Sequence, residues 1–230
     1  MKKITLILRA GVPSAHLPGL LQRPFAETTL LELALHKIAA LEGIAQRFLL
    51  IAHEDFAIPH GASIELLRHA NEDPRAPWPL PQALSPHLDR FDDLLFILDP
   101  CLPFVSRETL QSALRFVQES NFPSYTSGVM TRDWIFDQQN LPLTNSDPQN
   151  VTTNKGRFFY RAVHAFHVIS KNHLLQHHTL WTMTQNDPHV IEIPEREGVA
   201  IRDEIEWEYA EYVFRERRRE ASASSRPAHS

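Results

Sequence analysis

The chain has 230 residues, of which 43% are hydrophobic and 22% are charged, and its formal net charge is −5. These proportions are typical of a soluble globular protein, and the negative charge gives no general attraction to nucleic acid or to an anionic membrane surface. The only cysteine is Cys101, which excludes an intrachain disulfide framework and a cysteine-rich zinc site. No apolar run approaches the roughly 20 residues of a membrane span, so we expect a cytoplasmic protein.

Strand and helix patterns alternate through the first half of the chain. Continuous apolar runs predict buried strands at residues 4–8, 47–52 and 93–98. Helical spacing of apolar residues predicts helices at residues 30–41, 62–69 and 106–119, the last capped by Ser106. The proline-rich stretch at residues 71–81 excludes a helix or a central strand. This alternation predicts an α/β fold with a mainly parallel sheet that is covered on both faces.

The second half is less regular and carries a segment with few core signals. Residues 130–155 are rich in turn formers, which is typical of a long functional loop or of an excursion toward another subunit. After it the pattern predicts, in order, a strand, a helix, a strand and a helix at residues 160–169, 171–180, 190–193 and 204–219. The tail at residues 221–230 is small and polar, so we expect it to be disordered.

Histidine is abundant, with 13 in the chain, and two pairs need interpretation. His173 and His177 stand four apart on a predicted helix, a spacing that can hold a metal, but no further ligand completes a set, which favours two surface histidines. His164 and His167 differ by three on a predicted strand, so we expect them to point to opposite faces. Cys101 follows a proline in an apolar context and is interpreted as a core residue.

Several short motifs occur in the order found in one enzyme family. They are residues 17–26 (LPGLLQRPFA), 98–106 (LDPCLPFVS), 133–143 (DWIFDQQNLPL) with 147–153 (DPQNVTT), and 164–175 (HAFHVISKNHLL). In this order they resemble the acylneuraminate cytidylyltransferases, which make CMP-activated acidic sugars such as CMP-sialic acid. The resemblance implies a three-layer α/β sandwich of the nucleotide-diphospho-sugar transferase type over residues 1–220. It also implies a small dimerisation arm at residues 130–165, and hence a homodimer.

The resemblance also assigns expected roles to individual residues. Phosphate-loop chemistry falls to Arg9, Ser14 and His16 as catalytic residues, and nucleotide contact to Ala10, Gly11, Ser14, Gly19, Asp99 and Pro100. Contact with the sugar carboxylate falls to Asn154, Arg157 and Arg161. A Mg²⁺ ion would be held by Asp99, Asp203 and Glu206. CTP and a sugar acid are the expected partners.

Three stretches depart from the family pattern, one of them the family's Thr-Gln, which appears here as Thr153-Asn154. Its phosphate loop has an arginine, two glycines, a serine and a lysine, which align here with Gly11, Val12, Pro13, Ser14 and Ala15. Its two metal-binding aspartates align with Ala200 and Arg202, and a cation at a metal-ligand position repels the metal. Two hypotheses therefore remain: an enzyme that transfers CMP from CTP to a sialic-acid-like sugar acid, or a catalytically degenerate homologue. The latter would bind a sugar nucleotide or act as a partner subunit in surface polysaccharide biosynthesis.

Overall fold

A computed structural model describes residues 2–10, 17, 19–51, 63–69, 79–144 and 158–224, with side chains to residue 220. The strands are β1 (Ile4–Arg9), β2 (Pro24–Phe25), β3 (Thr28–Thr29), β4 (Gln46–Ile51), β5 (Glu65–Arg68), β6 (Leu94–Leu98), β7 (Ser124–Thr131), β8 (Phe159–Ser170) and β9 (His189–Glu192). The helices are α1 (Leu30–Ala39), α2 (Leu80–Leu84), η1 (Ser85–Arg90), α3 (Arg107–Glu119), α4 (Lys171–His177), η2 (Glu195–Glu197) and α5 (Glu204–Ser224).

One seven-stranded sheet forms the centre of the fold, in the order β5-β4-β1-β6-β8-β7-β9. Strands β5, β4, β1 and β6 are parallel to one another, whereas β8 runs antiparallel to both β6 and β7. Because β1, β4 and β6 point the same way, their carboxyl ends meet at one edge, where ligands bind in open α/β sheets. The predicted α/β fold with a mixed, mainly parallel sheet is confirmed.

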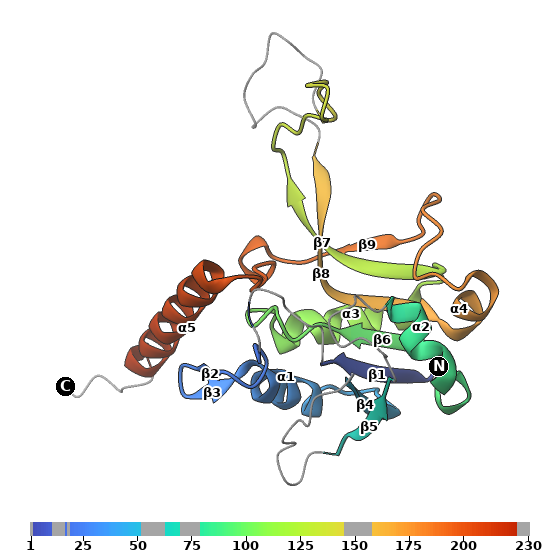
Figure 1. Ribbon diagram of the computed structural model, residues 1–230, viewed down its shortest axis with the longest axis horizontal. Helices are drawn as coiled ribbons and strands as arrows, with labels where there is room; N and C mark the ends of the chain where they lie inside the picture. The colour runs from blue at the N-terminus through green and yellow to red at the C-terminus, as the bar shows by residue number, and fades with distance from the viewer. Residues whose placement is uncertain are drawn as a thin grey trace.

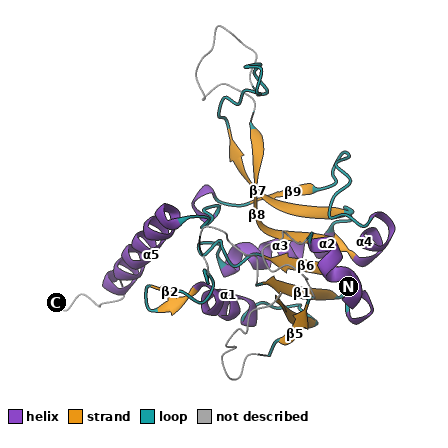
Figure 2. Cartoon of the chain, in the orientation of Figure 1, coloured by secondary structure: helices purple, strands orange, loops and turns teal. Residues whose placement is uncertain are grey.

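Apolar side chains cover both faces of the sheet. In β1, Ile4, Leu6 and Leu8 belong to a core that includes residues of α1, α3 and α5, while Ile7 belongs to a core with residues of α2 and α4. This split follows from the alternation of side chains along a strand. Figure 1 shows the helices distributed on the two faces, which gives the three-layer sandwich that was predicted. Figure 2 shows the same layering by secondary structure.

Local caps fix where the helices start. Thr29 forms a capping box with Glu32 at the start of α1, and the Ser106 hydroxyl accepts a hydrogen bond from the Thr109 amide at the start of α3, as predicted. Helix α5 is attached to the body by Trp207, whose ring packs edge-on against Phe25 at 5.2 Å. None of the helices in the described ranges combines the length and apolar character needed to cross a bilayer.

The outer parts of β7 and β8 project from the body as a hairpin (Figure 1). The described part of this hairpin exposes a set of large apolar side chains, namely Met130, Ile135, Phe136, Leu141, Leu143, Phe158 and Tyr160. The predicted arm at residues 130–165 includes this hairpin, although residues 145–157 lie outside the described part of the chain.

Three local predictions are wrong. Residues 65–68 form strand β5 and not a helix, because Leu67 packs into the core while the segment pairs with β4. The proline-rich stretch was expected to exclude a helix, but α2 begins within it at Leu80, with Pro81 in the first turn, where a proline costs no hydrogen bond. Helix α5 continues to Ser224, so the first residues of the expected disordered tail are helical.

Candidate functional site

A cavity of about 370 Å³ lies beyond the carboxyl end of β6, in the size range of small-molecule sites. Its walls come from the loop after β6, from the first half of β8, and from the segment that leads into α5. The lining residues are Leu20, Asp99, Cys101, Leu102, Arg161, Ala162, Val163, His164, Gly198, Ala200, Ile201 and Arg202. Four segments that are distant in sequence, near residues 20, 99, 161 and 198, thus meet at the edge of the sheet where α/β folds bind ligands.

The cavity brings together several residues that the sequence singled out. Asp99 and Arg161 line it, and so do Ala200 and Arg202, the positions aligned with the family's aspartates. Arg9 ends β1 nearby, since its charge contributes to lowering the pKa of His164. The predicted residues Gly11, Ser14, His16, Asn154 and Arg157 lie outside the described part of the chain.

The remaining predicted nucleotide contacts lie within the described ranges but do not line the cavity. Ala10 is fully buried, and its amide donates to the Leu50 carbonyl at 2.8 Å. This hydrogen bond continues the pairing of β1 with β4. Gly19 adopts φ +68° in a turn, a conformation that favours glycine. Pro100 is part of the loop after β6 and lines a smaller pocket that is described below.

Asp99 shapes the loop after β6. One of its carboxylate oxygens accepts a hydrogen bond from the Cys101 amide at 2.8 Å. Burial, followed by the nearby Asp99 charge, raises the pKa of the Cys101 thiol well above its usual value, so the thiol stays protonated and is not a nucleophile. The structure therefore agrees with the interpretation of Cys101 as a packing residue.

His164 is a cavity residue that the sequence analysis did not propose. It adopts φ 58°, a left-handed conformation that is uncommon for a non-glycine residue. The register explains why: Thr126 pairs with His167 while Gly128 pairs with Ala162, so β8 carries extra residues in a bulge. The buried Ser127 hydroxyl holds the bulge, accepting hydrogen bonds from the Ala165 and Phe166 amides at 2.8 and 3.3 Å.

The bulge overturns the expectation that His164 and His167 face opposite sides of the sheet. Their ring centroids lie 5.3 Å apart, and the ring of Trp181 stacks on His164 at 5.8 Å. Burial lowers the pKa of both histidines, that of His167 to about 3, so both imidazoles are neutral at physiological pH. The two rings come together only because of the bulge, and no pattern in a single sequence predicts that a histidine adopts a positive φ.

The predicted metal ligands do not converge. Asp99 lines the cavity, but Asp203 and Glu206 do not. The Asp203 carboxylate accepts from the Glu206 amide at 2.8 Å, as helix-capping residues do, and the Glu206 carboxylate accepts from the amide and the guanidinium of Arg202. No group of three or more His, Cys, Asp or Glu side chains in the described ranges could hold a metal ion. The donor set therefore does not fit Mg²⁺, and the magnesium site stays a prediction.

Of the two histidines on α4, His173 is placed differently from the expectation. His173 is buried rather than on the surface, and its Nε2 lies 3.7 Å from an oxygen of the buried Asp187. The ring of His177 lies 4.6 Å from that of His173. His173 therefore packs beside Asp187, whereas His177 is exposed.

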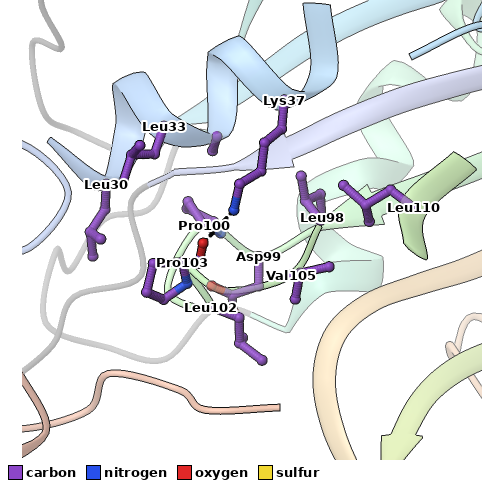
Figure 3. Close-up of a pocket in the computed structure, with 11 residues that line it drawn as sticks. Leu30, Leu33, Lys37, Leu98, Asp99, Pro100, Leu102, Pro103, Val105 and Leu110 are labelled. Atoms are coloured by element: carbon purple, nitrogen blue, oxygen red, sulfur yellow. Dashed lines mark hydrogen bonds between the residues drawn. The ribbon is translucent and has the colours of Figure 1, made fainter. Parts of the chain in front are cut away.

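A second, much smaller pocket lies between α1 and the loop after β6. Figure 3 shows Lys37 of α1 reaching the loop after β6, where its Nζ donates to the Pro103 carbonyl at 2.5 Å. The pocket holds about 10 Å³, roughly the space of one water. Burial lowers the pKa of Lys37 to about 8, and the Glu197 carboxylate opposes that shift. The Ser106 amide donates to Glu197 at 3.0 Å, so both ends of the segment from Pro103 to Ser106 are fixed.

Comparisons with known proteins agree with this geometry at the level of the fold. No protein-family model matches the chain, and no curated protein matches it significantly. A solved CMP:2-keto-3-deoxy-manno-octonic acid synthetase complexed with CTP has a TM-score of 0.63 and 12% identity, with 94% of this chain and 99% of that chain covered. The 4-diphosphocytidyl-2C-methyl-D-erythritol synthase from Anaerococcus prevotii has a TM-score of 0.62 and 12% identity, with 93% and 96% covered. The chain therefore has the fold of these cytidylyltransferases.

Proposed function

We propose that the chain is a cytidylyltransferase-like protein that binds CTP in the cavity beside Asp99 and transfers CMP to a sialic-acid-like sugar acid. The observation that carries this proposal is the cavity itself. It combines Asp99 with two arginines and a neutral histidine at the sheet edge where this fold accepts ligands. A similar solved structure is complexed with CTP, which supports the choice of nucleotide.

The arginines account for the acidic ligands. Arg161 projects from the first half of β8 into the cavity and would receive the sugar carboxylate, together with the expected contacts Asn154 and Arg157. Arg9, Ser14 and His16 would act on the phosphates. Of these residues, Ser14, His16, Asn154 and Arg157 lie outside the described part of the chain, so their roles rest on the resemblance alone.

The reaction is a phosphoryl-group substitution. A hydroxyl oxygen of the sugar acid forms a bond to the α-phosphorus of CTP, and the bond from that phosphorus to the bridging oxygen breaks. Pyrophosphate leaves with the electron pair, and the hydroxyl proton passes to a base. Among the described lining residues His164 carries the only imidazole, and its lowered pKa leaves it neutral and able to accept that proton.

A second candidate function rests on the carboxylates. Because Glu206 and Asp203 are both engaged by donors of the chain itself, the cavity is short of the groups expected for Mg²⁺-dependent transfer. The degenerate homologue would keep sugar-nucleotide binding and lose transfer, serving as a binding or partner subunit in surface polysaccharide biosynthesis. The two candidates share CTP or CMP binding and differ in pyrophosphate release.

Self-association follows from the hairpin in this proposal. Its exposed apolar residues cannot be buried against their own body while the hairpin projects, which supports pairing with a second copy. Light scattering on the full chain should give the mass of a dimer. Replacing Phe136 and Leu141 with Asp should give a folded monomer, whereas a monomeric parent protein contradicts this part of the proposal.

The proposal is tested by calorimetric titration of the full chain with CTP, CMP and CDP, followed by an assay of pyrophosphate release with a panel of sugar acids. Binding of CTP together with release of pyrophosphate supports the enzyme. Binding without release supports the second candidate. No binding of any cytidine nucleotide at millimolar concentration refutes the enzyme and the nucleotide-binding form of the second candidate.

A further inference from the structure

The charges that face the cavity are mainly positive. Of the described residues that line it, Arg161 and Arg202 are cationic and Asp99 is the only carboxylate. Arg9 adds a third positive charge close by: burial is the main cause of the lowered pKa of His164 and of His167, and the Arg9 charge adds to both shifts. A cavity with this lining attracts anions and repels a free divalent cation.

The position where a metal ligand was expected holds a guanidinium in a fixed orientation. Glu206, four residues later, accepts from the Arg202 amide at 2.7 Å and from Nε at 3.1 Å, and a further bond joins it to Nη2. The Arg202 side chain remains 77% exposed, so the guanidinium keeps donors for a ligand. The Glu206 side chain is 26% exposed and is held at the start of α5.

A divalent cation would have to compete with this arrangement. To reach Glu206 it must displace a guanidinium that forms several charge-assisted hydrogen bonds with that carboxylate. To reach Asp203 it must remove the acceptor of the Glu206 amide. Neither carboxylate lines the cavity, so the ion would also lie away from the ligand.

We propose that Arg202 and Arg161 bind the phosphate groups of the nucleotide directly, in the place of a divalent cation, so that nucleotide binding does not require Mg²⁺. A guanidinium can donate two parallel hydrogen bonds to a phosphate and stays charged at any working pH. This inference rests on the proposed function, because it takes the ligand to be a cytidine nucleotide.

Two variants of one ion pair distinguish an arginine site from a metal site. Arg202→Ala removes the proposed phosphate donor and should weaken CTP binding about ten- to a hundredfold. Glu206→Gln removes the competing carboxylate while keeping the side-chain shape, and should leave CTP binding unchanged or strengthen it by up to about tenfold. If Glu206 were a metal ligand, the same change would weaken binding and abolish its response to Mg²⁺.

The measurement is calorimetric titration of the full chain with CTP, once in EDTA and once with excess Mg²⁺. Arg219→Ala and Glu216→Gln are the matched controls, because these residues form a similar ion pair at 2.6 Å further along α5 and do not line the cavity. Circular dichroism checks that each variant is folded. We expect equal affinities in the two buffers within about threefold, and no effect of the controls.

The outcomes distinguish a failure of this inference from a failure of the proposed function. CTP binding that appears only with Mg²⁺, or that weakens in Glu206→Gln, overturns the inference and leaves the proposed function standing. Absence of CTP binding in both buffers refutes the proposed function itself. An Arg202→Ala protein that binds as tightly as the parent overturns the inference even where binding is independent of Mg²⁺.

Discussion

Ser127 offers a direct test of how the bulge at the cavity is maintained. This side chain is fully buried in β7, and its hydroxyl accepts from the amides of Ala165 and Phe166, which are also fully buried. Ser127→Ala removes the acceptor without adding bulk and leaves both amides without that partner. A buried donor without a partner costs about 1–3 kcal/mol, so we expect the free energy of unfolding to fall by about 2–4 kcal/mol.

The assay is urea unfolding of the parent and of the variant, followed by fluorescence. Ser112→Ala is the matched control, because Ser112 is exposed on α3, and we expect it to change stability by less than about 0.5 kcal/mol. A Ser127→Ala protein that is destabilised by less than about 0.5 kcal/mol would show that the bulge needs no internal acceptor. Our account of the bulge would then be wrong.

Three further predictions concern groups around the cavity. His164→Gly should leave the free energy of unfolding unchanged or raise it by about 1 kcal/mol, because φ 58° suits glycine, while CTP-dependent transfer should fall. A loss of stability would contradict the backbone strain at this position. Comparison with His164→Ala separates the effect of strain from the effect of losing the side chain. Burial lowers the pKa of Lys37 in the folded state to about 8, so the unfolded state binds more protons between pH 8 and 10.5. The free energy of unfolding, measured in urea, should therefore rise with pH by up to about 3 kcal/mol over this range. The Lys37→Met protein should lose this rise. Burial raises the pKa of Asp187, but hydrogen bonds from Ser124 and Thr182 outweigh burial and lower it. The contribution of Asp187 to the free energy of unfolding should therefore be lost as the pH falls through that pKa. In Asp187→Asn the free energy of unfolding should depend less on pH in the acid range.

Of the strands that the sequence predicted, β1, β4 and β6 are apolar on both faces. In β1, β4 and β6 nearly every side chain is buried in one of the two cores, so a continuous apolar run is enough to identify them. The edge strand β5 was mistaken for a helix because only Leu67 of its four residues is buried, and so short a segment carries no clear period.

Strand β7 shows why a buried strand can be missed altogether. Ser124, Thr126 and Ser127 are polar by sequence yet buried in the structure. Each hydroxyl is satisfied by a group that is distant in the chain: Asp187, His167, and the amides of the bulge in β8. Burial of polar groups is tolerated only with such partners, and a single sequence does not reveal them.

The candidate site was predictable in its position but not in its chemistry. Topology alone brings the ends of β1 and β6 to one edge, which placed Asp99 correctly. The segment that enters α5 was interpreted by the reach of its carboxylates, and this interpretation ignored the order of its charges. An arginine that is followed four residues later by a glutamate at the start of a helix can form an ion pair with that glutamate, as Arg202 does with Glu206. A pair of this kind presents its cation rather than its carboxylate to whatever lies beyond the helix start. The spacing of the charges, and not their number, therefore decides whether this end of the cavity attracts a metal ion or a phosphate.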